Sequence, residues 1–358
     1  MVQARAAREE FEAVGAPGAV VDLDPFVRNP YLSLLGDPLK VFGGRRIRDE
    51  LLPGLLSGRL RVGCLLYSEP GAGSDLAAVQ TRADSDGDDY VVNGQKIWTS
   101  YAHEAQFALL LARTDWDVVK HAGLSFFVVD MDSPGIEVRP IRQITGDTDF
   151  NEVFLTDVRV PAARMIGDPG DGWKVLQTAL AAERAGMGGG ASTSRRSRGG
   201  FDEVVGDLIE LARAAGRDGD AVVRQEIVKN LSWRLTNTWT GQRAVMQARR
   251  GSFDLANVGK LAMSRILHCG NDLRFRLQGR QSLLYDYEHP LDYPVDRDLM
   301  FGFINSIGGG SDQIQRNIIS ERVLGLPKGH EPDKGVPFRE VRKGGTARSV
   351  GPAGERAS

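Results

Sequence analysis

The chain of 358 residues is poor in cysteine, in histidine and in net charge. Its two cysteines, Cys64 and Cys269, cannot build the framework of disulfides that holds small secreted domains together. With only five histidines in the chain they also form no convincing zinc-binding pattern, so we expect no metal site. The 45 basic and 47 acidic residues leave a net charge of -2, which argues against general nucleic-acid binding.

Long hydrophobic runs are missing as well. The longest, around residues 107–112 and 124–129, are far shorter than the roughly 20 apolar residues that a membrane-spanning helix needs. The first residues lack the apolar core of a signal peptide. We therefore expect a cytoplasmic protein without membrane insertion. Glycine, in contrast, is in excess at 43 residues, which favours tight loops and close backbone approaches.

The central part of the chain and the longer part that follows it differ in the spacing of their apolar residues. Residues 61–166 contain many short runs rich in β-branched and aromatic residues, separated by turn clusters, which is typical of an antiparallel sandwich or barrel. Residues 167–327 have apolar residues at three- and four-residue spacing over several long stretches, which predicts a bundle of helices. The fold class is therefore predicted as multidomain α+β.

The two ends of the chain give weaker patterns. Residues 1–60 predict an abbreviated helical region, whose clearest helix begins near Arg45 and has Ile47, Leu51 and Leu55 on one face. Residues 328–358 are rich in charge, glycine and proline, and we predict a flexible tail there.

The sharpest local motif is the sequence YSEPGAGSD at residues 67–75. A predicted strand enters a turn in which proline fixes φ and two glycines allow a ligand to approach the backbone closely. The hydroxyls of Ser68 and Ser74 could bind a polar ring or a phosphate. A well-formed β-turn without a ligand would explain the same residues.

A second motif, VNGQKIWTS, follows at residues 92–100. Its Asn-Gly pair predicts a hairpin turn, after which a strand ends in Trp98 and two hydroxyl residues. An aromatic ring beside small hydrogen-bond donors suits a planar heterocycle. Taken alone, however, Trp98 is better explained as a core residue.

Four segments in one order identify a resemblance. YSEPGAGSDLA, YVVNGQKIWTS, GDGWKVLQTALAAERAG and GGGSDQIQRNIISERVLGLP together resemble the acyl-CoA dehydrogenase family over roughly residues 45–327. The resemblance implies an N-terminal helical domain, a middle β-domain and a C-terminal four-helix bundle. It also implies FAD, an acyl-CoA substrate oxidised across its α and β carbons, and an electron-transfer flavoprotein or similar acceptor.

The resemblance also implies where the catalytic base lies. Most family members carry a glutamate in the loop before the final helix, but this sequence has Gly309 at that position. A subset of the family instead places the glutamate on the first helix of the bundle, just before an arginine, and Glu183 and Arg184 match that pattern. Glu183 would take the α-proton while hydride leaves for flavin N5, although an ordinary surface glutamate would fit the local sequence too.

Further roles follow from the same resemblance. The backbone N–H of Gly309 would polarise the thioester carbonyl, a role that needs no side chain. The expected cofactor contacts are Leu65, Tyr67, Ser68, Gly73, Ser74, Trp98, Ser100, Ser311 and Gln313.

One departure from the family pattern bears on assembly, and a group of small residues bears on the substrate. The segment that usually grips the FAD pyrophosphate is replaced by a stretch containing Arg195, Arg196 and Arg198, which either substitute for it or are solvated. This favours a heteromer with a second dehydrogenase-like subunit, with a homo-oligomer as the alternative. Small residues near Glu183, such as Ala179, leave room for a branched or steroid-like acyl group, or simply allow close helix packing.

Two other functions fit the sequence. One is a flavin-dependent monooxygenase of the same fold, which needs no carboxylate base. The other is a non-catalytic partner subunit of a heteromeric dehydrogenase, which the shortened N-terminal region and the missing arginine segment would suit.

Overall fold

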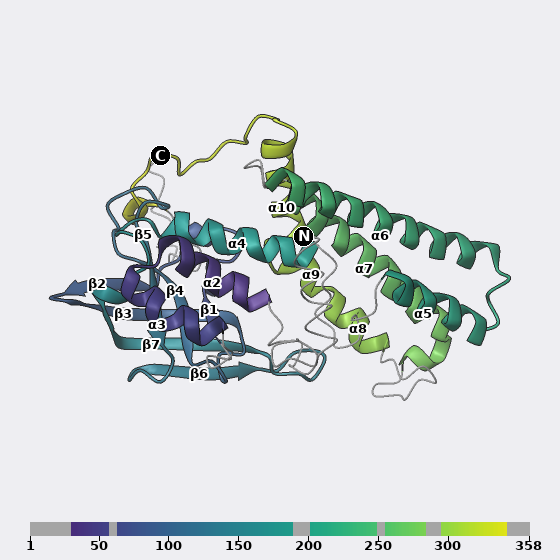
Figure 1. The fold of residues 1–358 in the computed structure, drawn as a ribbon, viewed down its shortest axis with the longest axis horizontal. Coiled ribbons are helices and arrows are strands. Elements are labelled where there is room, and N and C mark those ends of the chain that lie inside the picture. The colour runs from purple at the N-terminus through teal and green to yellow at the C-terminus, as the bar shows by residue number, and fades with distance from the viewer. Residues whose placement is uncertain (1–29, 57–62, 189–200, 249–254, 284–294, 342–358) are drawn as a thin grey trace, which may run out of the picture.

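The computed structural model describes residues 30–56, 63–188, 201–248, 255–283 and 295–341, and Figure 1 shows its helices and strands. Two short helices, α2 (Pro30–Phe42) and α3 (Arg45–Leu56), precede the sheet. The prediction for α3 is confirmed, because Ile47 and Leu51 are buried and Leu55 packs against the same core. The short N-terminal helical part is therefore an amphipathic cover on the β-domain.

The β-domain is one sheet that curves into a half-barrel. Its strand order is β1-β4-β2-β3-β7-β6, with β5 paired to β4 outside this path. Four of the six strand pairs are antiparallel, as predicted, but β1 and β2 each pair with β4 in parallel. The strands are β1 (Gly63–Leu66), β2 (Arg82–Asp86), β3 (Asp89–Ser100), β4 (Phe107–Arg113), β5 (Leu124–Asp130), β6 (Ile136–Ile141) and β7 (Phe150–Pro161).

Strand β4 divides two hydrophobic cores. All seven of its residues are buried. Because side chains alternate along a strand, Phe107, Leu109 and Leu111 enter the core shared with the helices, while the intervening residues enter the core inside the half-barrel. This double burial explains why β4 is a continuous apolar run rather than an alternating one.

The C-terminal domain contains seven α-helices within the described residues. The four long ones, α4 (Gly172–Gly188), α5 (Phe201–Ala214), α6 (Ala221–Ala248) and α7 (Leu255–Gln278), form the predicted bundle. Three shorter ones follow: α8 (Val295–Gly302), α9 (Ile304–Ile307) and α10 (Asp312–Ile318).

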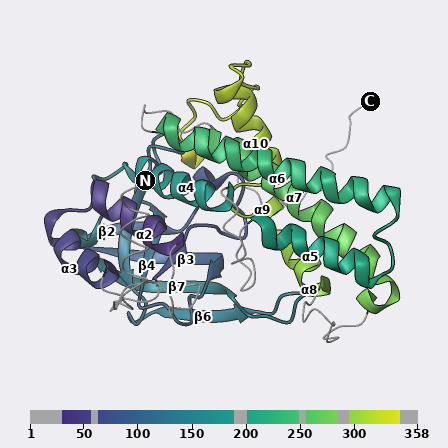
Figure 2. The same cartoon turned by 45° about the vertical axis from the view of Figure 1, so that its right-hand side comes forward.

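Helix α4 joins the two domains. It packs against α2 on one side and α7 on the other, and it also contacts β5. Figure 2 shows α4 lying between the sheet and the long helices α6 and α7. Within the residues that the structure describes, none of the helices has the length and apolar character needed to cross a bilayer.

The structure differs from the predicted flexible tail at residues 337–341, which dock onto the β-domain. Phe338 is completely buried, and its ring centroid lies 3.4 Å from the guanidinium carbon of Arg113. The backbone N–H of Phe338 donates to the carbonyl of Val118 at 2.8 Å. A single aromatic residue in a polar stretch thus anchors the segment, while residues 342–358 lie outside the described part of the chain.

We expect Phe338→Ala to release this anchor. Truncating a buried phenylalanine costs about 3–5 kcal/mol of stability. Here the cost cannot exceed the free energy with which the segment docks, because the segment can detach instead. The amides of Phe338 and Arg339 should lose hydrogen-exchange protection while that of β4 is retained. Arg339→Ala is the control, since it removes only an exposed ion pair with Asp117. Undiminished protection in Phe338→Ala would contradict the anchoring role.

Candidate active site

A buried ion pair brings the two sequence motifs together beneath the site. The Lys96 ammonium on β3 is fully buried and lies 2.9 Å from a carboxylate oxygen of Glu69. It also donates to the carbonyls of Tyr67 at 3.0 Å and Leu111 at 2.8 Å. Because all three N–H donors of Lys96 are used, this ion pair connects the 67–75 loop to β3 and, through Leu111, to β4.

Glu69 is held in its ionised form. Burial by itself would raise the pKa of this carboxyl, but the Lys96 charge and hydrogen bonds outweigh it, so the pKa lies below its ordinary value. Two of those bonds come from the backbone N–H groups of Gln80 and Thr81, at 2.6 and 2.8 Å. The Glu69 carboxylate therefore links the 67–75 loop to residues 80 and 81, which lie beyond the loop, and to β3.

Trp98 lies at the irregular end of β3. The register of β3 with β7 shifts between Lys96 and Thr99, and Trp98 has a φ of 61°, which is rare for an aromatic residue. The N–H of Ile97 donates to the carbonyl of Ser68, so the first motif holds this bulge. As a result the Trp98 side chain is 58% exposed, and the core-residue interpretation is wrong.

Among the residues of the two motifs themselves, two buried hydroxyls have no hydrogen-bond partner within the described part of the chain. They belong to Tyr67 and Thr99. Buried polar atoms are normally paired, so orphaned ones next to an exposed tryptophan indicate a site built for a polar, planar ligand. Of the other predicted contacts, Leu65 and Ser100 are half-buried, whereas Gly73 and Ser74 are exposed at the loop.

Glu183 lies on the inward face of α4. It follows Val175 and Ala179 at four-residue intervals, and both are completely buried in the same core cluster as Tyr67. Burial and then the negative charge of Glu183 raise the pKa of Tyr67 well above its ordinary value. The helix thus brings Glu183 to the 67–75 loop, while the side chain of Arg184 lies outside the described part.

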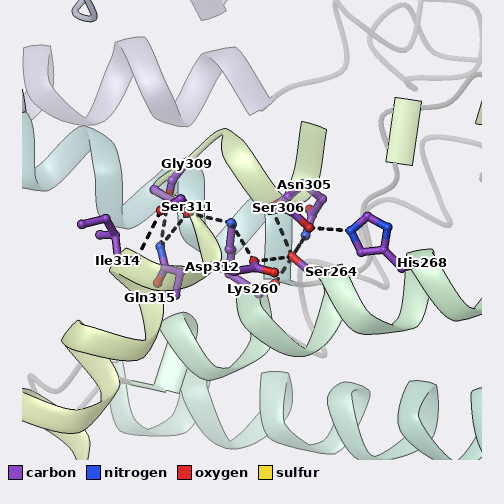
Figure 3. A network of polar contacts seen from close by, with 11 residues as sticks. Lys260, Ser264, His268, Asn305, Ser306, Gly309, Ser311, Asp312, Ile314 and Gln315 are labelled. Carbon is purple, nitrogen blue, oxygen red and sulfur yellow. Dashed lines mark hydrogen bonds and ion pairs between the residues drawn. The ribbon is translucent and has the colours of Figure 1, made fainter. Parts of the chain in front are cut away.

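The loop that carries Gly309 is clamped from below by polar side chains (Figure 3). Gly309 and Gly310 have φ values of 63° and 86°, which favour glycine. Lys260 Nζ donates to the Gly310 carbonyl at 2.7 Å, and Gln315 Nε2 donates to the Gly309 carbonyl at 2.9 Å. A Cβ on Gly310 would lie 2.8 Å from Gln315 Nε2, so this backbone path requires glycine.

The clamp extends into α7 through residues that the sequence did not reveal. Fully buried Lys260 is 3.6 Å from Asp312, whose carboxylate also accepts a hydrogen bond of 2.7 Å from Ser264. The predicted contact Ser311 caps α10, its hydroxyl accepting from the Ile314 N–H, and Gln313 is exposed. Lys260 and Ser264 are four residues apart in a helix whose apolar residues have the same spacing. This shared spacing was the only feature of the sequence that indicated that both polar side chains lie on the buried face.

Comparison with known proteins decides the family. Models of the acyl-CoA dehydrogenase middle and C-terminal domains match residues 64–158 and 170–324. The acyl-CoA dehydrogenase IpdE1 of Mycobacterium tuberculosis is 40% identical over 304 residues, covering 82% of this chain and 74% of that protein. The chain belongs to the acyl-CoA dehydrogenase family.

Solved structures of this family agree. The Tcur3481-Tcur3483 steroid acyl-CoA dehydrogenase matches with a TM-score of 0.75 and 27% identity, over 84% of this chain and 77% of that one. The ChsE4-ChsE5 complex from Mycobacterium tuberculosis matches with a TM-score of 0.71 and 27% identity, over 89% and 81%. Both belong to assemblies of two different chains by their names.

The family membership makes FAD the cofactor, and the residues present fit it. The exposed ring of Trp98 and the orphaned hydroxyl of Thr99 next to it in the chain provide an aromatic surface and a polar atom of the kind that a flavin ring requires. Of the arginines considered for the pyrophosphate, Arg195, Arg196 and Arg198 lie outside the described residues.

Proposed function

We propose that this acyl-CoA dehydrogenase oxidises an acyl-CoA thioester across its α and β carbons, with Glu183 as the base. The observation that carries the proposal is the position of Glu183 on the buried face of α4, beside Tyr67 of the loop that carries the first motif. Gly309, where most family members carry the glutamate, cannot act as a base. One carboxylate is therefore present for the proton transfer, on the helix instead of the loop.

Three groups of the chain share the work. The Glu183 carboxylate removes the α-proton, and Arg184 orients that carboxylate or the substrate by a charge-assisted hydrogen bond. The N–H of Gly309 donates to the thioester carbonyl, where negative charge develops as the proton leaves. Bound FAD supplies the acceptor for the β-hydride. The apolar cluster around Tyr67 keeps water away from this chemistry.

The clamp beneath Gly309 supports its proposed role. A backbone N–H stabilises developing charge only if it is already aimed at the oxygen before the reaction begins. Lys260 and Gln315 hold the adjacent carbonyls of Gly310 and Gly309, so the peptide groups that directly follow the Gly309 N–H keep their direction without the substrate. A fixed donor of this kind costs no reorganisation in the transition state.

A bulky acyl group is the substrate class we propose. Ala179, one turn before Glu183, is small and lies in the core cluster with Tyr67. The matching Tcur3481-Tcur3483 enzyme is named a steroid acyl-CoA dehydrogenase, which supports a steroid-like acyl chain here. A panel of straight-chain, branched and steroid acyl-CoA thioesters, assayed with an artificial electron acceptor, tests this. Preference for the straight chains would contradict it.

The assembly we propose is a heteromer in the cytoplasm, with an electron-transfer flavoprotein or a similar protein as acceptor. Both solved structures named above are complexes of two chains, and the stretch at residues 192–200 lacks the family's pyrophosphate-gripping pattern. Both cysteines are free thiols, which suits a reducing compartment.

We expect the chain purified alone to contain little FAD, because the partner completes the site. Co-expression with a dehydrogenase-like neighbour from the same genome should restore about one flavin per chain pair. The flavin absorbance per mole of protein, measured after removal of free flavin, checks both statements. Full loading of the chain alone would exclude the shared site and favour a homo-oligomer.

A further inference from the structure

The phenol of Tyr67 has a polar atom that the fold leaves without a partner. Its ring packs in the core cluster, with its centroid 5.5 Å from that of Phe126. Its hydroxyl is buried and has no hydrogen-bond partner within the described residues. Phenylalanine would fill the same apolar space without this penalty, so packing alone does not account for a tyrosine.

The group with a proposed catalytic role that shares this region is Glu183. It is on the α4 face that carries Val175 and Ala179 into the Tyr67 cluster, so helix and loop present carboxylate and phenol to the same region. Glutamate has three rotatable side-chain bonds, and a change of rotamer moves its carboxylate without moving the helix. A carboxylate accepts only, and a protonated phenol is a donor suited to it.

We propose that the Tyr67 hydroxyl is a hydrogen-bond donor to the Glu183 carboxylate, which it orients and keeps ionised for proton removal. Tyr67 is then a positioning residue that acts through Glu183. This inference rests on the proposed function of Glu183 as the base. The single proton of the phenol then goes to Glu183, so the contact with the flavin that the sequence predicts for Tyr67 is made by its ring or backbone.

Electrostatics support the direction of this bond. Burial and the charge of Glu183 keep the pKa of Tyr67 well above its ordinary value, so the phenol retains its proton at neutral pH and donates it to the bond. A hydrogen bond to the charged form of a carboxyl favours that form. Removing the donor therefore makes Glu183 easier to protonate, and the enzyme loses its base at a higher pH.

Other charges around the site are unchanged by a substitution at Tyr67. Beneath the loop is the Glu69–Lys96 pair, and the elements packed against α4 carry Asp37 and Lys40 on α2 and Lys260 on α7. Because these groups are common to both proteins, a difference in titration between wild type and Tyr67→Phe reports the phenol.

The first test is the pH profile of kcat/KM for Tyr67→Phe in the co-expressed, FAD-loaded complex. A hydrogen bond to a charged group corresponds to about one pH unit. We expect the acid limb to move to higher pH by about that amount, and only the position of the limb is compared, because the height of the plateau also reports contact of residue 67 with the flavin. Tyr90→Phe, the same replacement in the other core, should leave the limb in place. An unmoved limb in Tyr67→Phe would overturn the proposal.

A second test needs no turnover. Infrared difference spectra between each protein and its Glu183→Gln counterpart isolate the carboxyl band of residue 183, which is then titrated with pH. We expect the protonated band to emerge at higher pH in Tyr67→Phe than in wild type, and coincident titrations would overturn the inference. If no acyl-CoA is turned over but the band shifts, the proposed function fails and the bond stands. If acyl-CoA is turned over but neither the acid limb nor the carboxyl band shifts, the proposed function stands and the hydrogen bond is excluded.

Discussion

Glu183→Gln should lower kcat with the preferred acyl-CoA by roughly 10²–10⁴-fold, the usual contribution of a positioned general base. Glutamine keeps the size of the side chain but cannot accept the α-proton at neutral pH. The measurement is turnover of the co-expressed complex with an artificial electron acceptor. FAD content and assembly should be unchanged, because the substitution is nearly isosteric.

Glu210→Gln is the matched control. Glu210 is an exposed glutamate on another helix of the same domain, α5, so the same chemical change there should leave kcat within experimental error. If Glu183→Gln retains activity within a few-fold of wild type, Glu183 is not the base. A non-catalytic role for this subunit, or flavin chemistry without a base, would then become the better explanation.

Lys96→Met should cause the largest loss of stability. It leaves the Glu69 carboxylate buried without its cation, and breaking a buried ion pair in this way costs about 3–5 kcal/mol. It also removes the donors to the carbonyl of Tyr67 in the loop and to that of Leu111 on β4. We expect a lower thermal midpoint and a loss of bound flavin, because the 67–75 loop and the Trp98 bulge are held by the same contacts. Calorimetry and flavin absorbance measure the two effects.

Arg139→Met provides the comparison for this change. Arg139 pairs with Glu137 on the exposed strand β6, and exposed pairs contribute about 0–1 kcal/mol. Replacement of a basic residue by methionine at both positions separates the effect of burial from that of losing a positive charge, and the Arg139 variant also loses the contact of its guanidinium with the Phe154 ring at 4.4 Å. A thermal midpoint in Lys96→Met no lower than in Arg139→Met would show that the buried pair does not hold the site together.

Much of the fold was predictable because its signals are local. The apolar spacing of Ile47, Leu51 and Leu55 predicts α3, and the change of period near residue 167 predicts where strands give way to helices. The two motifs of the β-domain were also identified as one site. The parallel pairing of β1 with β4 was not, since strand neighbours depend on contacts distant in sequence.

The support beneath the site was the least predictable part. Lysines are ordinarily solvated, but Lys260 is fully buried because its partners at Gly310 and Asp312 lie about 50 residues further along the chain. Phe338 is similar: one aromatic residue in a polar segment gives no periodic pattern, and its site around Arg113 exists only in the folded β-domain. Single buried residues of this kind leave no periodic pattern in the sequence.

Anaerobic addition of acyl-CoA to the FAD-loaded complex tests the central claim most directly. The proposed dehydrogenase requires the flavin absorbance near its visible maximum to bleach rapidly with wild type and not with Glu183→Gln, with no reductant other than the substrate. Rapid bleaching with wild type and loss of it in the variant would agree with α-proton removal by Glu183. Flavin that stays oxidised with every acyl-CoA, but is reduced by an NADH-dependent reductase and then consumes oxygen, would contradict the account and indicate a monooxygenase.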